Sequence, residues 1–174
     1  MSLAKKPKTV IGIVEKVSID THAVDVPAKI DTGADSSSIW ATDIRVDEND
    51  TLHFCLFGPG SPYYTGKPLQ RTDFSVSRVK NSTGQSEIRY RTHFTIRISG
   101  RKIKAMVNLS DRSNNTYKIL IGRRTISKKF LVDVSKNSSH LPRPRKSRHL
   151  RQALLKGPYK FHATNDTNQT GVEE

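Results

Sequence analysis

The sequence predicts an all-β fold, a barrel or a sandwich, with one short helix near the C-terminal end of the folded domain. Three observations indicate this class. Short segments rich in valine and isoleucine follow one another along the chain. Turn-forming sequences separate them, and helical periodicity is nearly absent. Many short strands joined by turns typically close into a barrel or pack as a sandwich.

The first strands are expected at 9–17 and 23–30, which are dominated by valine and isoleucine. A further strand is expected at 52–57. The segment 58–62 (Gly-Pro-Gly-Ser-Pro) has the composition of a loop.

Alternation of apolar and polar residues predicts a strand at 74–80 and, more clearly, another at 87–99. In the latter, one face carries Ile88, Tyr90, Thr92, Phe94, Ile96 and Ile98, and the other carries Arg89, Arg91, His93, Thr95 and Arg97. A tight turn at Gly100-Arg101 leads into a strand at 102–109. Short apolar strands are expected at 117–121 and 130–134, and a short helix at 123–128.

The 174 residues suffice for one domain with a core of its own. The composition changes after Val134: prolines and basic residues become frequent, and apolar periodicity disappears. We therefore expect a basic N-terminal extension at 1–8, a folded domain at 9–135 and a basic, disordered tail at 136–174, apart from one or two helical turns around 148–156. There is no internal repeat.

The formal net charge of +14 predicts attraction to polyanions, and the tail is a candidate for weak contact with nucleic acid or ribosomes. The single cysteine, Cys55, excludes an intramolecular disulfide and fits a reducing compartment. No apolar leader follows the basic start, and no run is long enough to span a membrane. We expect a cytoplasmic protein without a membrane partner.

The triplet Asp31-Thr32-Gly33 follows an apolar strand ending at Ile30 and precedes small and hydroxyl side chains. A carboxylate on a tight turn at a strand end lies exposed while its backbone stays fixed. Aspartic peptidases use two such carboxylates to activate one water molecule. The chain carries one triplet, so this chemistry would need two copies of the chain. The alternative is an ordinary Asx turn between two strands.

Further blocks accompany the triplet. Residues 119–123 (Ile-Leu-Ile-Gly-Arg) place apolar residues before Gly-Arg, and Asp35 stands four positions after Asp31. The remaining blocks are 28–34 (Ala-Lys-Ile-Asp-Thr-Gly-Ala), 79–84 (Val-Lys-Asn-Ser-Thr-Gly), 109–113 (Leu-Ser-Asp-Arg-Ser), 120–124 (Leu-Ile-Gly-Arg-Arg) and 130–133 (Phe-Leu-Val-Asp). In this order they resemble the small retropepsin-like aspartic peptidases that are often labelled ATP-dependent zinc proteases, over about residues 9–134.

The resemblance implies one closed β-barrel half of the acid protease fold, acting as a homodimer on peptides or proteins. It assigns the catalytic site to Asp31, Thr32 and Gly33, and the support of the active-site loop to Ala34, Asp35, Gly122 and Arg123, with Arg123 paired to Asp35. The hairpin tip Asn81, Ser82, Thr83 and Gly84 is the candidate flap. Arg89 and Arg112 are the candidate substrate-binding residues, and they would favour acidic or poly-glutamate peptides.

The residues indicate neither zinc nor ATP, and we expect no metal and no cofactor. None of the six histidines is spaced as His-Glu-x-x-His, and no Gly-x-x-x-x-Gly-Lys-Ser/Thr loop is present. The alternative function is a non-catalytic basic β-barrel module that binds RNA or a ribosomal protein.

Overall fold

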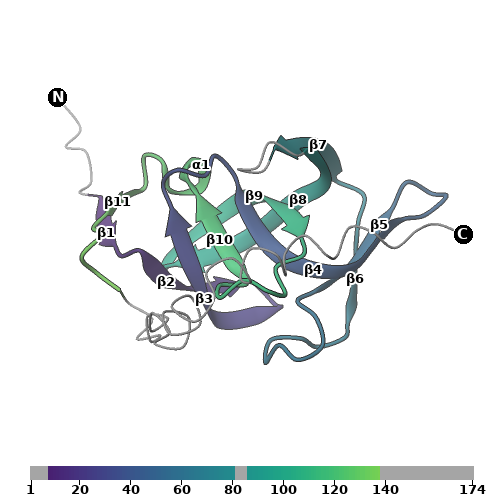
Figure 1. Cartoon of the computed structure of the whole chain (residues 1–174), viewed down its shortest axis with the longest axis horizontal. Helices are drawn as coiled ribbons and strands as arrows, with labels where there is room; N and C mark the ends of the chain where they lie inside the picture. The colour runs from purple at the N-terminus through teal and green to yellow at the C-terminus, as the bar shows by residue number, and fades with distance from the viewer. Residues whose placement is uncertain (1–7, 81–85, 138–174) are drawn as a thin grey trace, which may run out of the picture. The chain divides into compact units, whose positions relative to one another are not determined.

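A computed structural model of the chain describes residues 8–80 and 86–137. In this part the chain forms β-strands and one short helix (Figure 1). The strands are β1 (Thr9–Ile11), β2 (Val14–Ile19), β3 (Ala23–Asp31), β4 (Ser37–Val46), β5 (Leu52–Leu56), β6 (Pro68–Arg71), β7 (Phe74–Lys80), β8 (Ser86–Ile98), β9 (Arg101–Ser110), β10 (Ile119–Gly122) and β11 (Phe130–Val132), and the helix is α1 (Arg123–Ile126).

Six strands close into a barrel in the order β10-β3-β2-β8-β9-β4, because β4 also pairs with β10. The pairs β3–β10 and β4–β9 are parallel, whereas β2–β3, β2–β8, β8–β9 and β4–β10 are antiparallel. The strands β5 and β6 continue the sheet beyond β4. A closed barrel leaves few unpaired strand edges, which explains how short strands make a stable sheet.

The core fills the barrel with apolar side chains from nearly every strand. Its largest fully buried members include Phe54, Phe57, Leu52, Ile96 and Ile119. Phe54 and Phe94 pack edge to face, with their ring centroids 6.1 Å apart. Ile30 of β3 and Ile121 of β10 belong to the same core, which anchors the ends of these two strands where the candidate site lies.

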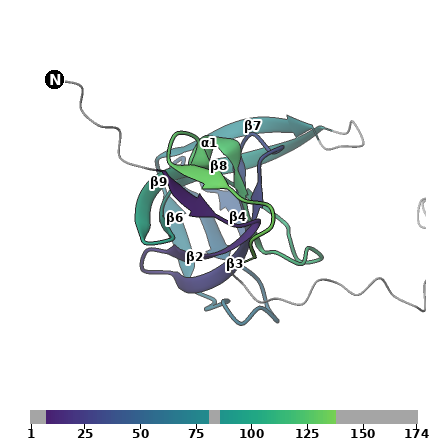
Figure 2. The same ribbon diagram turned by 90° about the vertical axis from the view of Figure 1, so that its left-hand side faces the viewer.

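The strands β7 and β8 form a long hairpin that extends beyond the barrel (Figure 2). The residues predicted on the apolar face of this strand are not all buried. Those from Thr92 to Ile98 are buried, but Ile88 is 65% exposed. The reason is that residues 86–90 pair with β7 alone, whereas β8 also pairs with β9 from Arg91 onward.

The predicted all-β class with one short helix is confirmed, with three differences in the elements. The strand predicted at 9–17 is two strands, because Gly12 and Ile13 turn toward Lys136, whose carbonyl accepts a hydrogen bond from the Ile13 N–H at 3.0 Å. The strands β4 and β6 were not predicted. The helix ends at Ile126, ahead of Lys128, which has a φ of +62°.

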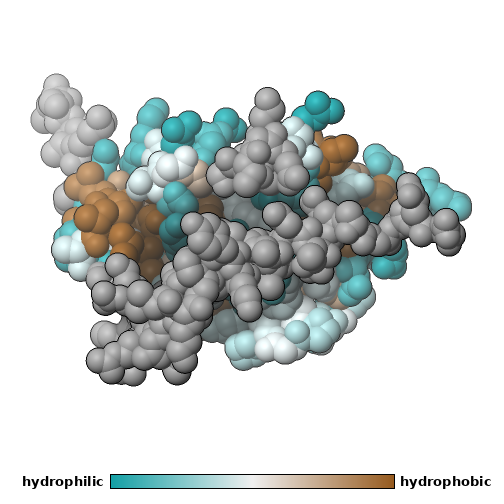
Figure 3. Space-filling view, in the orientation of Figure 1, coloured by the Kyte–Doolittle hydropathy of each residue, from teal (hydrophilic) through white to brown (hydrophobic). Residues whose placement is uncertain are grey.

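The short parallel sheet of β1 and β11 carries an apolar patch, which we define as Val10 and Leu131. The two residues are register partners, and both side chains are about half exposed. Figure 3 shows brown surface on the left of the molecule, where β1 and β11 lie in Figure 1.

The predicted helical turns around 148–156 and the tail beyond Asn137 lie outside the described residues. The predicted domain boundaries stay predictions. Over residues 8–80 and 86–137, the structure contains no helix that could cross a membrane.

Candidate active site

Asp31 is the last residue of β3, at an edge of the barrel where the chain turns toward β4. Its register partner is Gly122, the last residue of the parallel strand β10. The preceding Ile30 is buried in the core, while the Asp31 side chain keeps 26% of its surface exposed. The strand therefore anchors the backbone and presents the carboxylate to solvent.

One oxygen of this carboxylate shapes the turn that follows. Asp31 Oδ1 accepts hydrogen bonds from the N–H groups of Gly33 at 3.1 Å and Ala34 at 3.2 Å. This is the Asx turn that we considered as the alternative to a catalytic triplet, and the carboxylate remains accessible within it. Gly33 does not adopt a positive φ, so the Asp31 side chain, and not glycine's conformational freedom, makes the turn.

The other oxygen, Asp31 Oδ2, lies 3.3 Å from the ammonium nitrogen of Lys29. Burial acts to raise the pKa of Asp31, but the Lys29 ammonium and the Ala34 and Gly33 N–H groups outweigh it and hold the pKa below its ordinary value. In the single chain, this carboxylate is therefore ionised at neutral pH and able to accept a proton.

The loop after Asp31 is held by the start of α1. The N–H of Arg123 donates to the Ala34 carbonyl at 2.8 Å, and the N–H of Arg124 donates to the Asp35 carbonyl at 3.2 Å. Gly122 donates its N–H to Ser37 Oγ at 3.0 Å. These bonds tie the two signature segments together through the backbone.

The predicted pair between Arg123 and Asp35 is present, with Arg123 Nε 3.0 Å from Asp35 Oδ1. Arg124 adds a second contact, from Nη2 to Asp35 Oδ2 at 2.6 Å. The hydrogen bond from Arg123, together with the charges of both arginines, holds the pKa of Asp35 below its ordinary value. All three side chains are largely exposed, so we expect the pair to fix geometry more than to stabilise the fold.

Behind the loop lies a buried polar network centred on Asn108 of β9. Its amide nitrogen Nδ2 donates to Ser36 Oγ at 2.8 Å and to the Ser37 carbonyl at 3.1 Å. Its oxygen Oδ1 accepts from Ser77 Oγ at 3.3 Å. Because Ser77 belongs to β7, this network connects the loop beside Asp31 with the β7–β8 hairpin.

Arg112 follows β9 and is partly buried. Its Nε and Nη2 both donate to the Tyr117 carbonyl at 3.1 Å, which fixes the plane of the guanidinium. Burial and the charge of Arg89 lower the pKa of Arg112, while the charge of Asp31 acts to raise it. Arg112 therefore lies within electrostatic reach of Asp31. Arg89 is engaged by Glu87, with Nη2 2.6 Å from Oε2.

The candidate flap residues Asn81, Ser82, Thr83 and Gly84 lie outside the described residues. The strands on either side pair with each other in register from Phe74–Thr92 to Lys80–Ser86. Thr32 is described and exposed at the turn.

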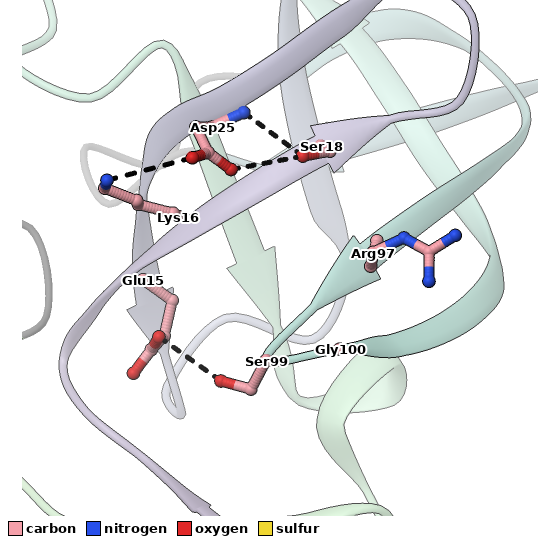
Figure 4. Close-up of a pocket in the computed structure, with 7 residues that line it drawn as sticks. All are labelled: Glu15, Lys16, Ser18, Asp25, Arg97, Ser99 and Gly100. Carbon is pink, nitrogen blue, oxygen red and sulfur yellow. Dashed lines mark hydrogen bonds and ion pairs between the residues drawn. The ribbon is translucent and has the colours of Figure 1, made fainter.

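Among the described residues, no three His, Cys, Asp or Glu side chains gather in a way that could hold a metal ion. A hollow of about 230 Å³ lies away from Asp31, between β2, β3 and the β8–β9 turn (Figure 4). Its two cations and two carboxylates balance, and Lys16 lies 3.7 Å from Asp25 within it.

Three residues of this site had no role predicted from the sequence: Lys29, Arg124 and Asn108. The period of two along a strand could have indicated Lys29, because residues 29 and 31 point to the same face. No local sequence pattern indicated Asn108, because its partners Ser36, Ser37 and Ser77 come from two distant segments.

Known proteins resemble this chain in sequence and in fold. A family model described as RimB-like, "Retropepsin-like aspartic endopeptidase RimB", matches residues 10–142. A "Probable alpha-L-glutamate ligase" of Shewanella pealeana is 30% identical over 134 residues, and one of Shewanella halifaxensis is 29% identical over 134 residues. Each match covers 75% of this chain and 29% of the relative, so the chain spans less than a third of these relatives.

A solved structure of a Legionella pneumophila protein of unknown function matches the fold with a TM-score of 0.59 and 23% identity. The match covers 75% of this chain and 97% of that one. At 23% identity the match supports the fold alone, and that fold agrees with the barrel described above.

Proposed function

Because the chain belongs to the RimB-like family of retropepsin-like aspartic endopeptidases, we propose that two copies of it form an aspartic endopeptidase. The observation that carries the proposal is the placement of Asp31. Its carboxylate is fixed by the Gly33 and Ala34 N–H groups at a strand end and remains accessible. One chain supplies one such triplet, and the chemistry needs two carboxylates around one water.

In the proposed dimer, the two Asp31 carboxylates lie side by side. Like charges at that distance cannot both ionise readily, so the pair holds one proton. The ionised Asp31 accepts a proton from water as the water oxygen attacks the peptide carbonyl carbon. The protonated Asp31 donates to the carbonyl oxygen. Collapse of the tetrahedral intermediate breaks the C–N bond, and the amine leaves with a proton from the dyad.

The other predicted residues have supporting roles in this proposal. Thr32, which is exposed in the single chain, would bond across the two-fold axis and hold the two loops together. Gly33 would let the backbone approach the dyad. The β7–β8 hairpin would cover the bound peptide and exclude water through its tip at 81–84.

The apolar patch of Val10 and Leu131 supports pairing with a second copy. Both side chains lie on the same two-stranded sheet and are about half exposed. Removing their apolar surface from water would be favourable. A second copy of this surface would cover them in a two-fold contact.

The charges around Asp31 support acidic peptides, including poly-glutamate, as substrates. Arg112 lies within electrostatic reach of Asp31, and Arg89 lies within reach of Arg112. The relatives named as probable alpha-L-glutamate ligases connect this type of domain with glutamate. Action on such a substrate in the cytoplasm is part of the same proposal.

The test compares the wild type with Asp31→Asn, which keeps the side chain's size and the Oδ1 acceptor of the turn. We expect the wild type to cleave a glutamate-rich peptide, and the variant to be folded by circular dichroism and inactive. Cleavage that persists in a folded Asp31→Asn protein would contradict the aspartyl mechanism.

A second candidate function is a non-catalytic basic module that binds RNA or a ribosomal protein. Two observations favour it. One face of β8 and β9 carries three cations: the cross-strand neighbours Arg97 and Lys102, with Lys104 nearby. The net charge of the chain is +14, which favours binding to a polyanion. Salt-dependent RNA binding that is unchanged by Asp31→Asn, without cleavage by the wild type, would support the module instead.

A further inference from the structure

Lys29 and Asp31 stand on the same face of β3, with the buried Ile30 between them pointing into the core. The Lys29 ammonium lies 3.3 Å from Asp31 Oδ2, and the Lys29 side chain is 52% exposed. The proposed peptidase site therefore contains an exposed cation in direct contact with its catalytic carboxylate.

An ion pair as exposed as this one contributes little to the stability of a fold. It also opposes the proposed chemistry, because a cation at Oδ2 disfavours the shared proton that the dyad needs. Burial acts toward the protonated form of Asp31, but it does not outweigh the groups that favour the ionised form. Arg112, from the segment after β9, is a further cation, and the Gly33 and Ala34 N–H groups also favour the ionised form.

We propose that Lys29 is a specificity-determining residue that pairs with an acidic side chain of the substrate next to the scissile bond. The inference rests on the proposed function and deepens it. When an acidic peptide binds, the ammonium moves from Asp31 Oδ2 to the substrate carboxylate. The ammonium then neutralises the charge of the substrate carboxylate. It also no longer contacts the dyad, where it opposes proton sharing. A neutral peptide leaves Lys29 on Asp31 and is cleaved poorly.

The geometry also locates the acidic residue. Because the Lys29 ammonium contacts the catalytic carboxylate, it can reach substrate side chains within about one residue of the scissile bond. Two copies of Lys29 would flank the dyad, one from each chain, so acidic residues on both sides of the scissile bond are favoured. Arg112 has less freedom to move than Lys29, because its Nε and Nη2 both donate to the Tyr117 carbonyl.

The experiment measures kcat/KM for two peptides that differ only in having glutamate or the neutral isostere glutamine at the residues flanking the scissile bond. The wild type is expected to prefer the glutamate peptide by about tenfold or more, as for a hydrogen bond between charged partners. Lys29→Met, which keeps the length and removes the charge, is expected to bring the ratio close to one. Lys29→Arg is expected to restore much of the preference.

Lys16→Met is the matched control. Lys16 lies on the neighbouring strand β2, is similarly exposed and pairs with Asp25 at 3.7 Å, away from Asp31. It changes the net charge by the same amount, so the preference for glutamate is expected to stay at the wild-type value. An equal loss of preference in Lys16→Met and Lys29→Met would show a general charge effect and overturn the inference.

The outcomes separate the inference from the proposed function. Absence of Asp31-dependent cleavage in the wild type overturns both. An Asp31-dependent enzyme whose Lys29→Met variant keeps the full glutamate preference overturns the inference alone. If Lys29→Met is folded and cleaves neither peptide, binding of the labelled glutamate peptide decides. It is compared between Asp31→Asn and Asp31→Asn/Lys29→Met: about tenfold weaker binding by the double variant supports the inference, and equal binding overturns it.

Discussion

The backbone of Gly122 packs against the backbone of Ser36 so closely that a Cβ atom on Gly122 would lie 2.5 Å from both the carbonyl carbon and the carbonyl oxygen of Ser36. The Ala34 carbonyl oxygen would lie at 2.9 Å. Gly122 is thus required at this position for steric reasons, because the loop after Asp31 crosses directly over the end of β10. This contact joins the two sequence signatures in space.

The first prediction concerns this contact. Gly122→Ala is expected to lower the free energy of unfolding by about 3 kcal/mol, because backbone atoms must move to admit the methyl group. Gly60→Ala is the control. Gly60 has a φ of +86° and open space around it, so alanine there costs only left-handed strain, about 1–2 kcal/mol. Urea unfolding measures both. A smaller loss for Gly122→Ala than for Gly60→Ala would contradict the close packing.

The second prediction concerns the network of Asn108, which is 3% exposed. Asn108→Leu removes the donor to the Ser37 carbonyl and leaves that carbonyl buried without it. We expect a loss of about 1–3 kcal/mol in the free energy of unfolding. Activity is expected to fall as well, because the network joins the Asp31 loop to β7. The control is Asn115→Leu, on an exposed turn, and urea unfolding and peptide cleavage are the two measurements. A stable, fully active Asn108→Leu protein would show that the network is dispensable.

The sequence predicted the barrel well where strands follow a simple pattern, and it failed at β4. Ser37 and Ser38, in a segment for which no strand was predicted, are fully or nearly buried. Ser37 Oγ is satisfied by the Gly122 N–H and Thr125, and Ser38 Oγ by Ser110. These partners lie more than 70 positions away, so no local pattern could indicate that the serines would be buried.

The site divides in the same way. The triplet at Asp31 and the pair of Asp35 with Arg123 could be anticipated, because they belong to sequence blocks of fixed order. For Lys29, the strand period indicates only that it shares a face with Asp31. Their contact depends on how a flexible side chain lies on the strand surface. The roles of Asp31 in catalysis and of Lys29 in specificity are predictions, and the substitutions at these two residues test them.

The third prediction is a pH dependence of stability. The folded-state pKa of Asp35 lies below its ordinary value of 3.8, chiefly because of Arg123. Between the two pKa values the unfolded chain binds more protons than the folded one. The contribution of Asp35 to stability is therefore complete above pH 3.8 and is lost as the pH falls through the folded-state pKa.

Urea unfolding at a series of pH values down to the lowest at which the protein stays folded measures this effect. Asp35→Asn is expected to give a shallower loss of stability with acid than the wild type. Glu48→Gln removes one negative charge from an exposed turn and serves as the control. Identical slopes for Asp35→Asn and the wild type would show that the ion pair does not persist in solution.

The fourth prediction concerns metals. The proposed water activation uses carboxylates alone, so EDTA is expected to leave kcat and KM for an acidic peptide unchanged. The same preparation with added zinc is the control for a loosely held ion. Loss of cleavage on chelation, with recovery on adding zinc, would overturn the aspartyl mechanism.

The fifth prediction tests whether the site is shared between two chains. Asp31→Asn chains mixed with wild-type chains are expected to form mixed dimers that hold one carboxylate and one amide, and these cannot share the proton. If pairing is random, a ninefold excess of the variant leaves about a tenth of the wild-type chains paired with each other, so cleavage falls about tenfold. Competition for substrate is removed by using a saturating peptide concentration.

The matched control is an equal excess of an Asp31→Asn protein that also carries Val10→Glu and Leu131→Glu. Charges in the apolar patch would keep this protein from pairing, so it should not inhibit. Wild-type activity that is unaffected by the simple Asp31→Asn variant, in chains shown to exchange partners, would mean that each chain acts alone.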